Sequence, residues 1–470
     1  MRGTAVLTGL VLALLLASPA VAQVPCVADF PDTAPAPQPG AKLRFGIDPG
    51  GPAGQLGPVP APSVPEDQGK IFSALERLRP PGGPFTVHLY RAYMSPEREA
   101  EDEEEHRRQV ELYTSRGYGV EIVIRYRRDN DAAGFAEFVR GVVRRFGSNP
   151  LVRGFQVTNE VNLTFSPDSS DGAYAASRDA LIQGVIAAKD EARARRYEQV
   201  KIGFNWVYRT DPGNERQFWE YLGSAGGERF VRSLDWVGLD AYPGTFFPPR
   251  TEPSTTGDLM VHALSTLRKC SMPMAGIPDS VPIHVEENGY ATGPDRPYED
   301  QRVAAERMLD ALDLYARVYG VTDYFWFDLR DADSSSPNFQ QQYGVMRDDY
   351  TPKPAFEVLR DRFARMTAPG EVRPPGAGGG GGGGDAEVAQ LRVKLRLRCY
   401  SRGVTVYLKR TGGVGSVRFA LRGRRLKDSR APFKRHLRLR PSGKRQLIRA
   451  VARIRGGGAS VTRVKHIRCG

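Results

Sequence analysis

The sequence predicts an α/β protein with a closed (β/α)8 TIM barrel, followed by a small C-terminal all-β sandwich. Short apolar strands alternate eight times with helical periodicity between residues 42 and 366. The glycine-rich first turn that is typical of an open doubly wound sheet, the structural alternative, does not occur. Beyond a run of seven glycines at 378–384, the apolar period changes to two, as in half-buried strands.

Each strand is predicted from a short run rich in β-branched and aromatic residues, and each helix from apolar residues three or four positions apart. We expect strands at 42–47, 85–91, 120–126, 152–159, 200–206, 234–242, 282–287 and 322–327. We expect helices near 66–79, 97–115, 131–147, 177–198, 257–270, 299–318 and 354–366, and helical pieces over 214–233.

The N-terminus has the pattern of an export signal. Arg2 precedes an apolar run from Val6 to Leu16, and small residues at 20–22 form a cleavage site. No later segment contains 18 consecutive apolar residues, so we expect no membrane span in the mature chain and an extracellular or cell-wall location. The predicted parts are a signal peptide (1–22), a Pro/Ala-rich lead (23–41), the barrel domain (42–370), a Pro/polyglycine linker (371–385) and a basic β-sandwich (386–470).

Charge is distributed unevenly between these parts. Residues 386–470 contain 25 basic and two acidic residues, a net charge of +23, whereas the remaining 42 basic and 52 acidic residues give −10. The basic module weakly resembles bacterial immunoglobulin-like repeats. We expect it to bind an anionic cell-surface polymer or to act as a spacer, and a carbohydrate-binding role is a further alternative. Nucleic-acid binding is not expected, because few aromatic residues interleave with the basic ones.

The chain has four cysteines, which allow three pairings. Disulfides suit an exported protein, and no close Cys/His spacing indicates a metal site. Because Cys399 and Cys469 bracket the C-terminal module, the domain organisation favours their pairing, and with it the pairing of Cys26 with Cys270.

The site of a (β/α)8 barrel lies at the carboxyl ends of its strands. Two carboxylate centres stand there, Glu160 and the pair Glu286-Glu287. Paired carboxylates with amides and aromatic rings suit cleavage of a glycosidic bond, in which one group donates a proton and the other attacks the anomeric carbon. No cofactor or metal is expected. The strand-end residues are Arg91, Asn159, Glu160, Asn205, Trp206, Asp240, Tyr242, Glu286, Glu287, Asn288, Trp326 and Asp328.

These residues resemble the clan A glycoside hydrolases, the retaining (β/α)8 group that includes families five and thirty-nine. Asn159-Glu160 on the fourth strand is similar to the clan's Asn-Glu, and Glu287-Asn288-Gly289 on the seventh to its Glu-Asn-Gly ending. The resemblance covers about residues 42–366 and implies that Glu160 is the acid/base and Glu287 the nucleophile of a poly- or oligosaccharide hydrolase. The expected substrate-binding residues are Arg91, Asn159, Asn205, Trp206, Tyr242 and Trp326.

The two adjacent acids leave one choice open. Successive side chains of a strand point to opposite sides, so only one of Glu286 and Glu287 should face the barrel mouth. The Asn-Gly that follows favours Glu287, with Glu286 as the alternative. His88 and His284 are expected to be scaffold residues rather than general bases. The alternative function is a catalytically silent carbohydrate- or wall-binding protein on the same barrel.

Overall fold

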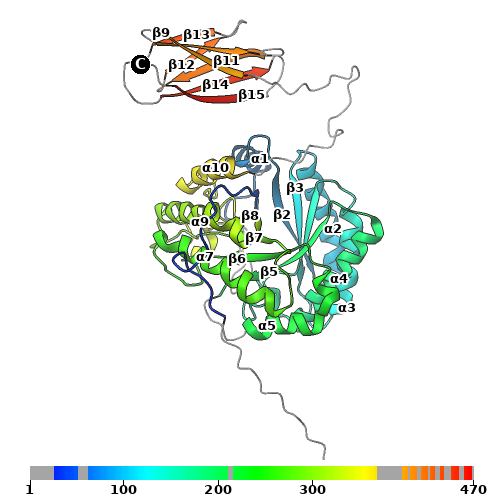
Figure 1. Cartoon of the computed structure of the whole chain (residues 1–470). Helices are drawn as coiled ribbons and strands as arrows, with labels where there is room; N and C mark the ends of the chain where they lie inside the picture. The colour runs from blue at the N-terminus through cyan, green and yellow to red at the C-terminus, as the bar shows by residue number, and fades with distance from the viewer. Residues whose placement is uncertain are drawn as a thin grey trace, which may run out of the picture. The chain divides into compact units, whose positions relative to one another are not determined.

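The structure is a computed structural model that describes residues 26–50, 62–209 and 215–367, and seven strands between residues 394 and 467. The chain divides into two compact units near residue 377 (Figure 1). The predicted signal peptide, the polyglycine linker and the pairing of Cys399 with Cys469 lie outside the described residues.

The first unit contains a closed barrel of eight parallel strands in sequence order, as predicted. The barrel closes where β8 pairs with β1, with Arg44 opposite Asp323 and Ile47 opposite Trp326. The strands are β1 (Arg44–Ile47), β2 (Phe85–Tyr93), β3 (Gly119–Tyr126), β4 (Val152–Val157), β5 (Lys201–Val207), β6 (Trp236–Ala241), β7 (Ile283–Asn288) and β8 (Val321–Trp326).

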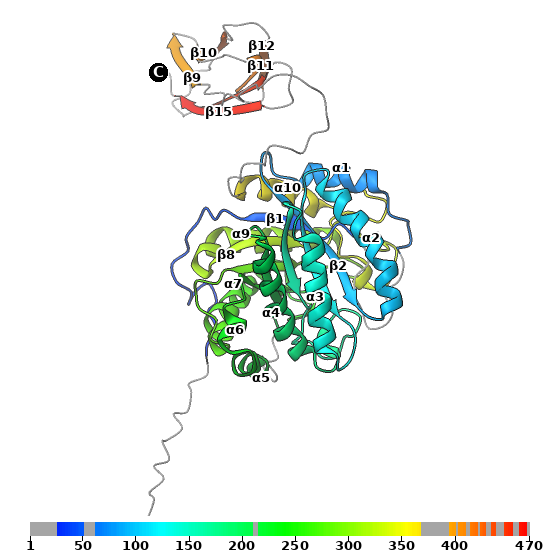
Figure 2. The same ribbon diagram turned by 90° about the vertical axis from the view of Figure 1, so that its right-hand side faces the viewer.

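Helices follow the strands and cover the outside of the barrel (Figure 2). In α3, Phe135, Val139, Val142 and Phe146 are spaced by three or four residues and are buried, because this stripe faces the sheet. The helices are α1 (Gln68–Leu78), α2 (Pro96–Thr114), α3 (Ala132–Phe146), α4 (Ser177–Arg195), α5 (Glu215–Tyr221), α6 (Gly227–Val231), α7 (Thr256–Ser265), α8 (Met272–Met274), α9 (Tyr298–Tyr319) and α10 (Pro354–Met366).

In the described part of the barrel unit, two π-helical turns follow or separate helices. The helical pieces expected over 214–233 are α5 and α6, which a π-helical turn over Leu222–Gly226 separates, and the helix expected near 257–270 is α7 followed by a π-helical turn over Thr266–Ser271. Gly227 has a φ of 55°, a conformation that glycine adopts without steric cost. Among the described helices, none combines the length and the apolar character needed to cross a bilayer.

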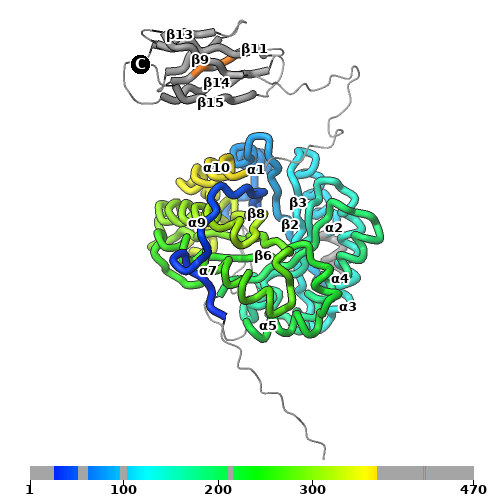
Figure 3. The backbone as a smooth tube through the Cα atoms, viewed as in Figure 1, coloured from blue at the N-terminus to red at the C-terminus, as the bar shows by residue number. Residues whose placement is uncertain are grey.

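The segment before β1 is fastened to the outside of the barrel (Figure 3). Cys26 and Cys270 form a disulfide, which confirms that predicted pairing. The carboxylate of Asp29 accepts hydrogen bonds from the ammonium group of Lys269 and from the hydroxyl of Ser265, and the backbone N–H of Gln38 donates to the carbonyl of Leu314. The N-terminal segment therefore ties α7 and α9 together from outside.

The second unit consists, in its described part, of strands in two antiparallel sheets. Val417 and Phe419, two apart in one strand, are fully buried, as the period of two predicts. The immunoglobulin-like sandwich stays a prediction. The strands are β9 (Lys394–Tyr400), β10 (Gly403–Lys409), β11 (Val414–Leu421), β12 (Arg424–Asp428), β13 (Lys434–Arg438), β14 (Gln446–Ile454) and β15 (Ser460–Ile467).

Candidate active site

A cavity of about 630 Å³ lies at the carboxyl ends of the barrel strands. Its wall combines carboxylates, guanidinium groups, amides and aromatic rings, a composition that suits a polar ligand with apolar faces. Of the residues predicted from the sequence, five line it: Arg91, Asn159, Glu160, Tyr242 and Glu287.

Glu287, near the end of β7, accepts hydrogen bonds from two tyrosine hydroxyls. Tyr90 of β2 donates to Oε1 at 2.6 Å, and Tyr242, which follows β6, donates to Oε2 at 2.5 Å. The two bonds fix the orientation of both carboxylate oxygens. Burial and the charge of Glu287 raise the pKa of both tyrosines well above their usual value, so the two hydroxyls keep the protons they donate.

Glu160 stands where the chain leaves β4 in a sharp turn. Thr158 and Glu160 have φ values of 66° and 48°, in the left-handed region that residues with a side chain rarely adopt. Asp171 holds this turn, because its Oδ2 accepts from the backbone N–H of Asn159 at 2.8 Å while Oδ1 pairs with Arg125 at 2.7 Å. The backbone N–H of Glu160 donates to Oδ1 of Asn205 at 2.8 Å. The side chain of Glu160 is thereby presented to the cavity.

The environment of Glu160 favours its protonated form. Burial and, next, the charge of Glu287 raise the pKa of Glu160 to about 8, although Arg125 and a bond from Ser170 act in the opposite direction. One carboxylate oxygen of Glu160 and one of Glu287 lie within 4.8 Å of each other. An oxygen of Asp240 lies within the same distance of both. The cavity therefore contains one carboxyl whose pKa is raised and a second that two tyrosine hydroxyls hold in a fixed orientation.

Hydrogen bonds from the amide side chains of Asn205 and Asn159 stabilise the surroundings of Glu160. Asn205 of β5 donates to Oδ1 of Asn159 at 2.7 Å and also to Asp240 of β6. The Asn159 amide donates in turn to the carbonyl of Ser169 at 2.9 Å. Burial, followed by the charges of Glu287 and Glu160, raises the pKa of Asp240 well above its usual value. Asn205, predicted as a substrate contact, thus positions Glu160 and Asn159 and does not line the cavity.

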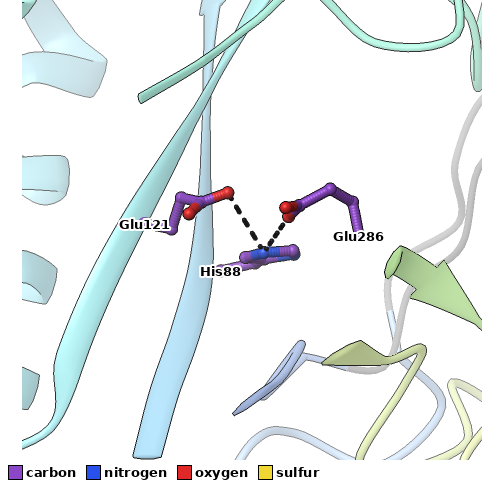
Figure 4. A group of neighbouring side chains, drawn as sticks. All are labelled: His88, Glu121 and Glu286. Carbon is purple, nitrogen blue, oxygen red and sulfur yellow. Dashed lines mark ion pairs between the residues drawn. The ribbon is translucent and has the colours of Figure 1, made fainter. Parts of the chain in front are cut away.

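Glu286 does not line the cavity, and its carboxylate is directed toward His88 (Figure 4). Its Oε2 lies 3.0 Å from Nε2 of His88, whose ring is also 3.6 Å from Glu121, and its Oε1 lies 3.0 Å from Nδ1 of His284. His284 continues the chain to Asp323 at 2.9 Å. The alternation of the strand therefore places Glu287 at the mouth and Glu286 in a buried ion-pair network beneath it.

The two histidines of this network, His88 and His284, are favoured in their protonated, positively charged form. Burial lowers the pKa of both histidines, but the carboxylates of Glu121 and Glu286 around His88, and of Asp323 and Glu286 around His284, raise each to about 10. Burial likewise disfavours ionised Glu286, yet bonds from His284 and His88 lower its pKa to about 2. His88, Glu121 and Glu286 have the composition of a metal-ligand set, with ligand atoms within 4.8 Å of one another. We interpret them as an ion-pair cluster.

Two predicted platforms lie outside the cavity lining. Trp206 is fully buried, and its indole N–H donates to Glu215 at 2.5 Å. Trp326, the last residue of β8, is also fully buried in the hydrophobic core. The next residue, Phe327, lines the cavity instead and packs edge-on against Tyr242 and Tyr343. Along a strand, a shift of one residue moves a side chain to the other side, which explains why Phe327 lines the cavity and Trp326 does not.

Two further residues of the candidate site, Tyr90 and Asp48, are not among those predicted from the sequence. Tyr90 lies one position before Arg91 and was not singled out, although it contacts Glu287 directly. Asp48 follows β1 and lines the cavity. Burial raises the pKa of Asp48 to about 7, against a bond from the backbone N–H of Gly50. Its position directly after a predicted strand was a usable indication, since every barrel strand delivers residues to the same mouth.

No protein-family profile matches the sequence, and a search of curated proteins finds no match. Among solved structures, similar chains include a Bacteroides uniformis beta-glucuronidase (14% identity, TM-score 0.44, covering 91% of this chain and 46% of that one). Others are a family 39 glycoside hydrolase from Bacteroides cellulosilyticus WH2 (13%, 0.44, 85% and 79%) and GH5_18 from Streptomyces cattleya in complex with GlcNAc (16%, 0.47, 70% and 81%). The chain thus spans less than half the length of the first of these. At such identities and TM-scores, function rests on the geometry of the site.

Proposed function

We propose that this protein is an exported, retaining O-glycosyl hydrolase acting on a poly- or oligosaccharide. The observation that carries the proposal is the pair Glu160 and Glu287, whose oxygens lie within 4.8 Å of each other at the mouth of the barrel. Retaining glycosidases hold their carboxyl groups about 5–5.5 Å apart, whereas inverting enzymes leave about 6.5–9.5 Å for a water molecule. The opposite electrostatic environments of the two groups support a division of roles.

In the first step, Glu287 attacks the anomeric carbon as the bond to the leaving oxygen breaks, and Glu160 donates its proton to that oxygen. A pKa of about 8 keeps Glu160 protonated at neutral pH. The hydroxyls of Tyr90 and Tyr242 hold Glu287 in place, so little reorganisation is needed before the attack. A covalent glycosyl-enzyme results.

In the second step, Glu160, now ionised, removes a proton from a water molecule that attacks the same carbon from the side the leaving group has vacated. The ester bond to Glu287 breaks, the sugar departs with its original anomeric configuration, and both carboxyls return to their starting states. Burial of the site limits competition from bulk water, and the aromatic side chains of Phe327 and Tyr343 line the cavity that the sugar would occupy.

The remaining parts of the chain extend the proposal. The N-terminal pattern supports export and an extracellular or cell-wall location. The charge of +23 over residues 386–470 suits attraction to an anionic cell-surface polymer, which would hold the enzyme near its substrate. The silent-binding alternative is less well supported, because both carboxylates are present in the cavity with their partners.

A panel of 4-nitrophenyl glycosides, with polysaccharides analysed for products, tests the proposal. Glu160→Gln and Glu287→Gln keep the side-chain shape and should each lower kcat/KM at least a thousandfold on the active substrate, since each removes one of the two reacting groups. Glu137→Gln on the exposed face of α3 is the matched control and should retain activity. Unchanged activity in both active-site variants would reject the proposal.

A further inference from the structure

One large apolar side chain stands exposed at the cavity. Phe165 is 56% exposed, and among the described large hydrophobic residues that are exposed it alone lines the cavity wall. Exposing a phenyl ring forgoes the stabilisation that its burial would give. Its position beside a ligand cavity makes a binding role the natural explanation.

The Phe165 ring is supported from one side. The guanidinium of Arg209 lies 5.6 Å from the centre of the Phe165 ring and 5.8 Å from that of Phe247, which also lines the cavity. Contacts of a guanidinium with aromatic faces are favourable and orient the rings. Two rings from different loops are thus held at one part of the rim.

The loop that carries Phe165 also carries the proton donor. Phe165 follows Glu160 by five residues, and the backbone N–H of Leu163 donates to the carbonyl of Glu160 at 2.8 Å. Ser166, Asp168 and Ser169 of the same loop line the cavity. The proposed nucleophile Glu287 has its hydrogen-bond partners on other parts of the barrel mouth. They are Tyr90 of β2 and Tyr242, which follows β6.

This arrangement would bind the two parts of a substrate at different sides of the cavity. A proton donor must reach the oxygen of the departing group, so that group lies against the loop of Glu160. The sugar that becomes attached to Glu287 lies on the side of Tyr90 and Tyr242. Phe165 is therefore on the leaving-group side of the scissile bond, where a flat ring can cover the apolar face of a pyranose.

We propose that Phe165 forms a binding subsite for a pyranose ring of the leaving group. The subsite implies that the leaving group of the natural substrate is a sugar rather than a small aglycone. The enzyme would then act on oligosaccharides or within glycan chains. The inference rests on the proposed glycosidase function and adds the recognition of the second sugar.

The test compares two substrates that share the glycone identified by the 4-nitrophenyl panel. One is its glycosyl fluoride, whose leaving group cannot contact Phe165, and the other is the matching trisaccharide. Phe165→Ala should lower kcat/KM for the trisaccharide about tenfold, as expected for loss of one ring contact, and leave the fluoride within twofold. Phe165→Tyr should restore the trisaccharide value. Phe30→Ala, which removes an exposed ring from the N-terminal segment, is the matched control and should change neither.

An equal loss on both substrates, or no loss on the trisaccharide, would overturn the subsite while leaving hydrolysis itself intact. A wild-type protein that hydrolyses neither substrate would refute the proposed function, and the subsite with it. Circular dichroism of Phe165→Ala, with the Phe165→Tyr variant beside it, separates loss of the ring contact from loss of folding.

Discussion

Glu286 and Glu287 are neighbours in β7, and their carboxylates have entirely different partners. Glu287 lines the cavity and accepts hydrogen bonds from Tyr90 and Tyr242, whereas Glu286 lies below and pairs with His88 and His284. The strand's alternation separates the two roles, one chemical and one structural. Fixing Glu286 on the inside also fixes the direction in which Glu287 points.

The first prediction concerns the pH dependence of activity. The reacting form needs protonated Glu160, whose pKa is raised to about 8 by burial and by Glu287. The protonated fraction falls as pH rises through that value, so kcat/KM should decrease on an alkaline limb centred near pH 8. Rates measured from pH 4 to 10 on the best 4-nitrophenyl glycoside check this, with Glu137→Gln as the control. A profile that stays flat to pH 10 would contradict the assignment of Glu160 as the acid.

The second prediction concerns the tyrosines that hold the nucleophile. Tyr90→Phe and Tyr242→Phe each remove a hydrogen bond to Glu287 and should lower kcat/KM about 10- to 100-fold, in line with a charged hydrogen bond of ~1.5–3 kcal/mol. Tyr315→Phe removes a hydroxyl on α9, away from the cavity, and should have no effect on rate. If the two active-site variants matched wild type, the hydroxyls would have no part in positioning Glu287.

The third prediction concerns stability and pH. The pKa values of His88 and His284 are raised from 6.5 to about 10, so the stabilisation they give is complete below pH 6.5 and is lost as pH rises to 10. The melting temperature should therefore fall across that window. Glu286→Gln removes the carboxylate that both rings share, and should lower the melting temperature at pH 6 and flatten its fall. An identical slope in wild type and variant would exclude the network as the cause.

The fourth prediction concerns the disulfide between Cys26 and Cys270, which are 244 residues apart. Closing so long a loop restricts the unfolded chain, and a stabilisation of about 2–5 kcal/mol is typical. The Cys26→Ser/Cys270→Ser double variant should unfold at lower denaturant concentration while keeping its kcat/KM, because the bridge joins the N-terminal segment to the outside of the barrel. An unchanged unfolding midpoint would show that the hydrogen bonds of Asp29 suffice to hold this segment.

Much of the fold was predictable because local and global requirements agree. The eight strands are short apolar runs bounded by turn residues, and β3 is buried along its whole length, as a strand covered on both faces must be. The apolar stripe of α3 matches the helical period. A pattern of apolar residues does not show where a π-helical turn forms, as over Leu222–Gly226 between α5 and α6 and over Thr266–Ser271 after α7.

Parts of the site required the three-dimensional structure. Glu160 and Glu287 could be located because each follows or ends a strand, and all strands open on the same mouth. The side to which a strand-end side chain turns depends on where the chain leaves the barrel, so the sequence does not show that Phe327 rather than Trp326 lines the cavity. Trp206 is buried, and its indole N–H donates to Glu215. Tyr90 contacts Glu287, which lies 197 positions away in the sequence.

The central claim is that Glu287 forms a covalent bond to the sugar while Glu160 supplies the proton. Incubation with a 2-deoxy-2-fluoro glycosyl fluoride of the active glycone, followed by peptide mapping in a mass spectrometer, tests it most directly. We predict one equivalent of fluoroglycosyl label on the peptide that contains Glu287, assigned by fragmentation to that residue. A label on Glu286, or no label together with a product of inverted configuration, would contradict the account.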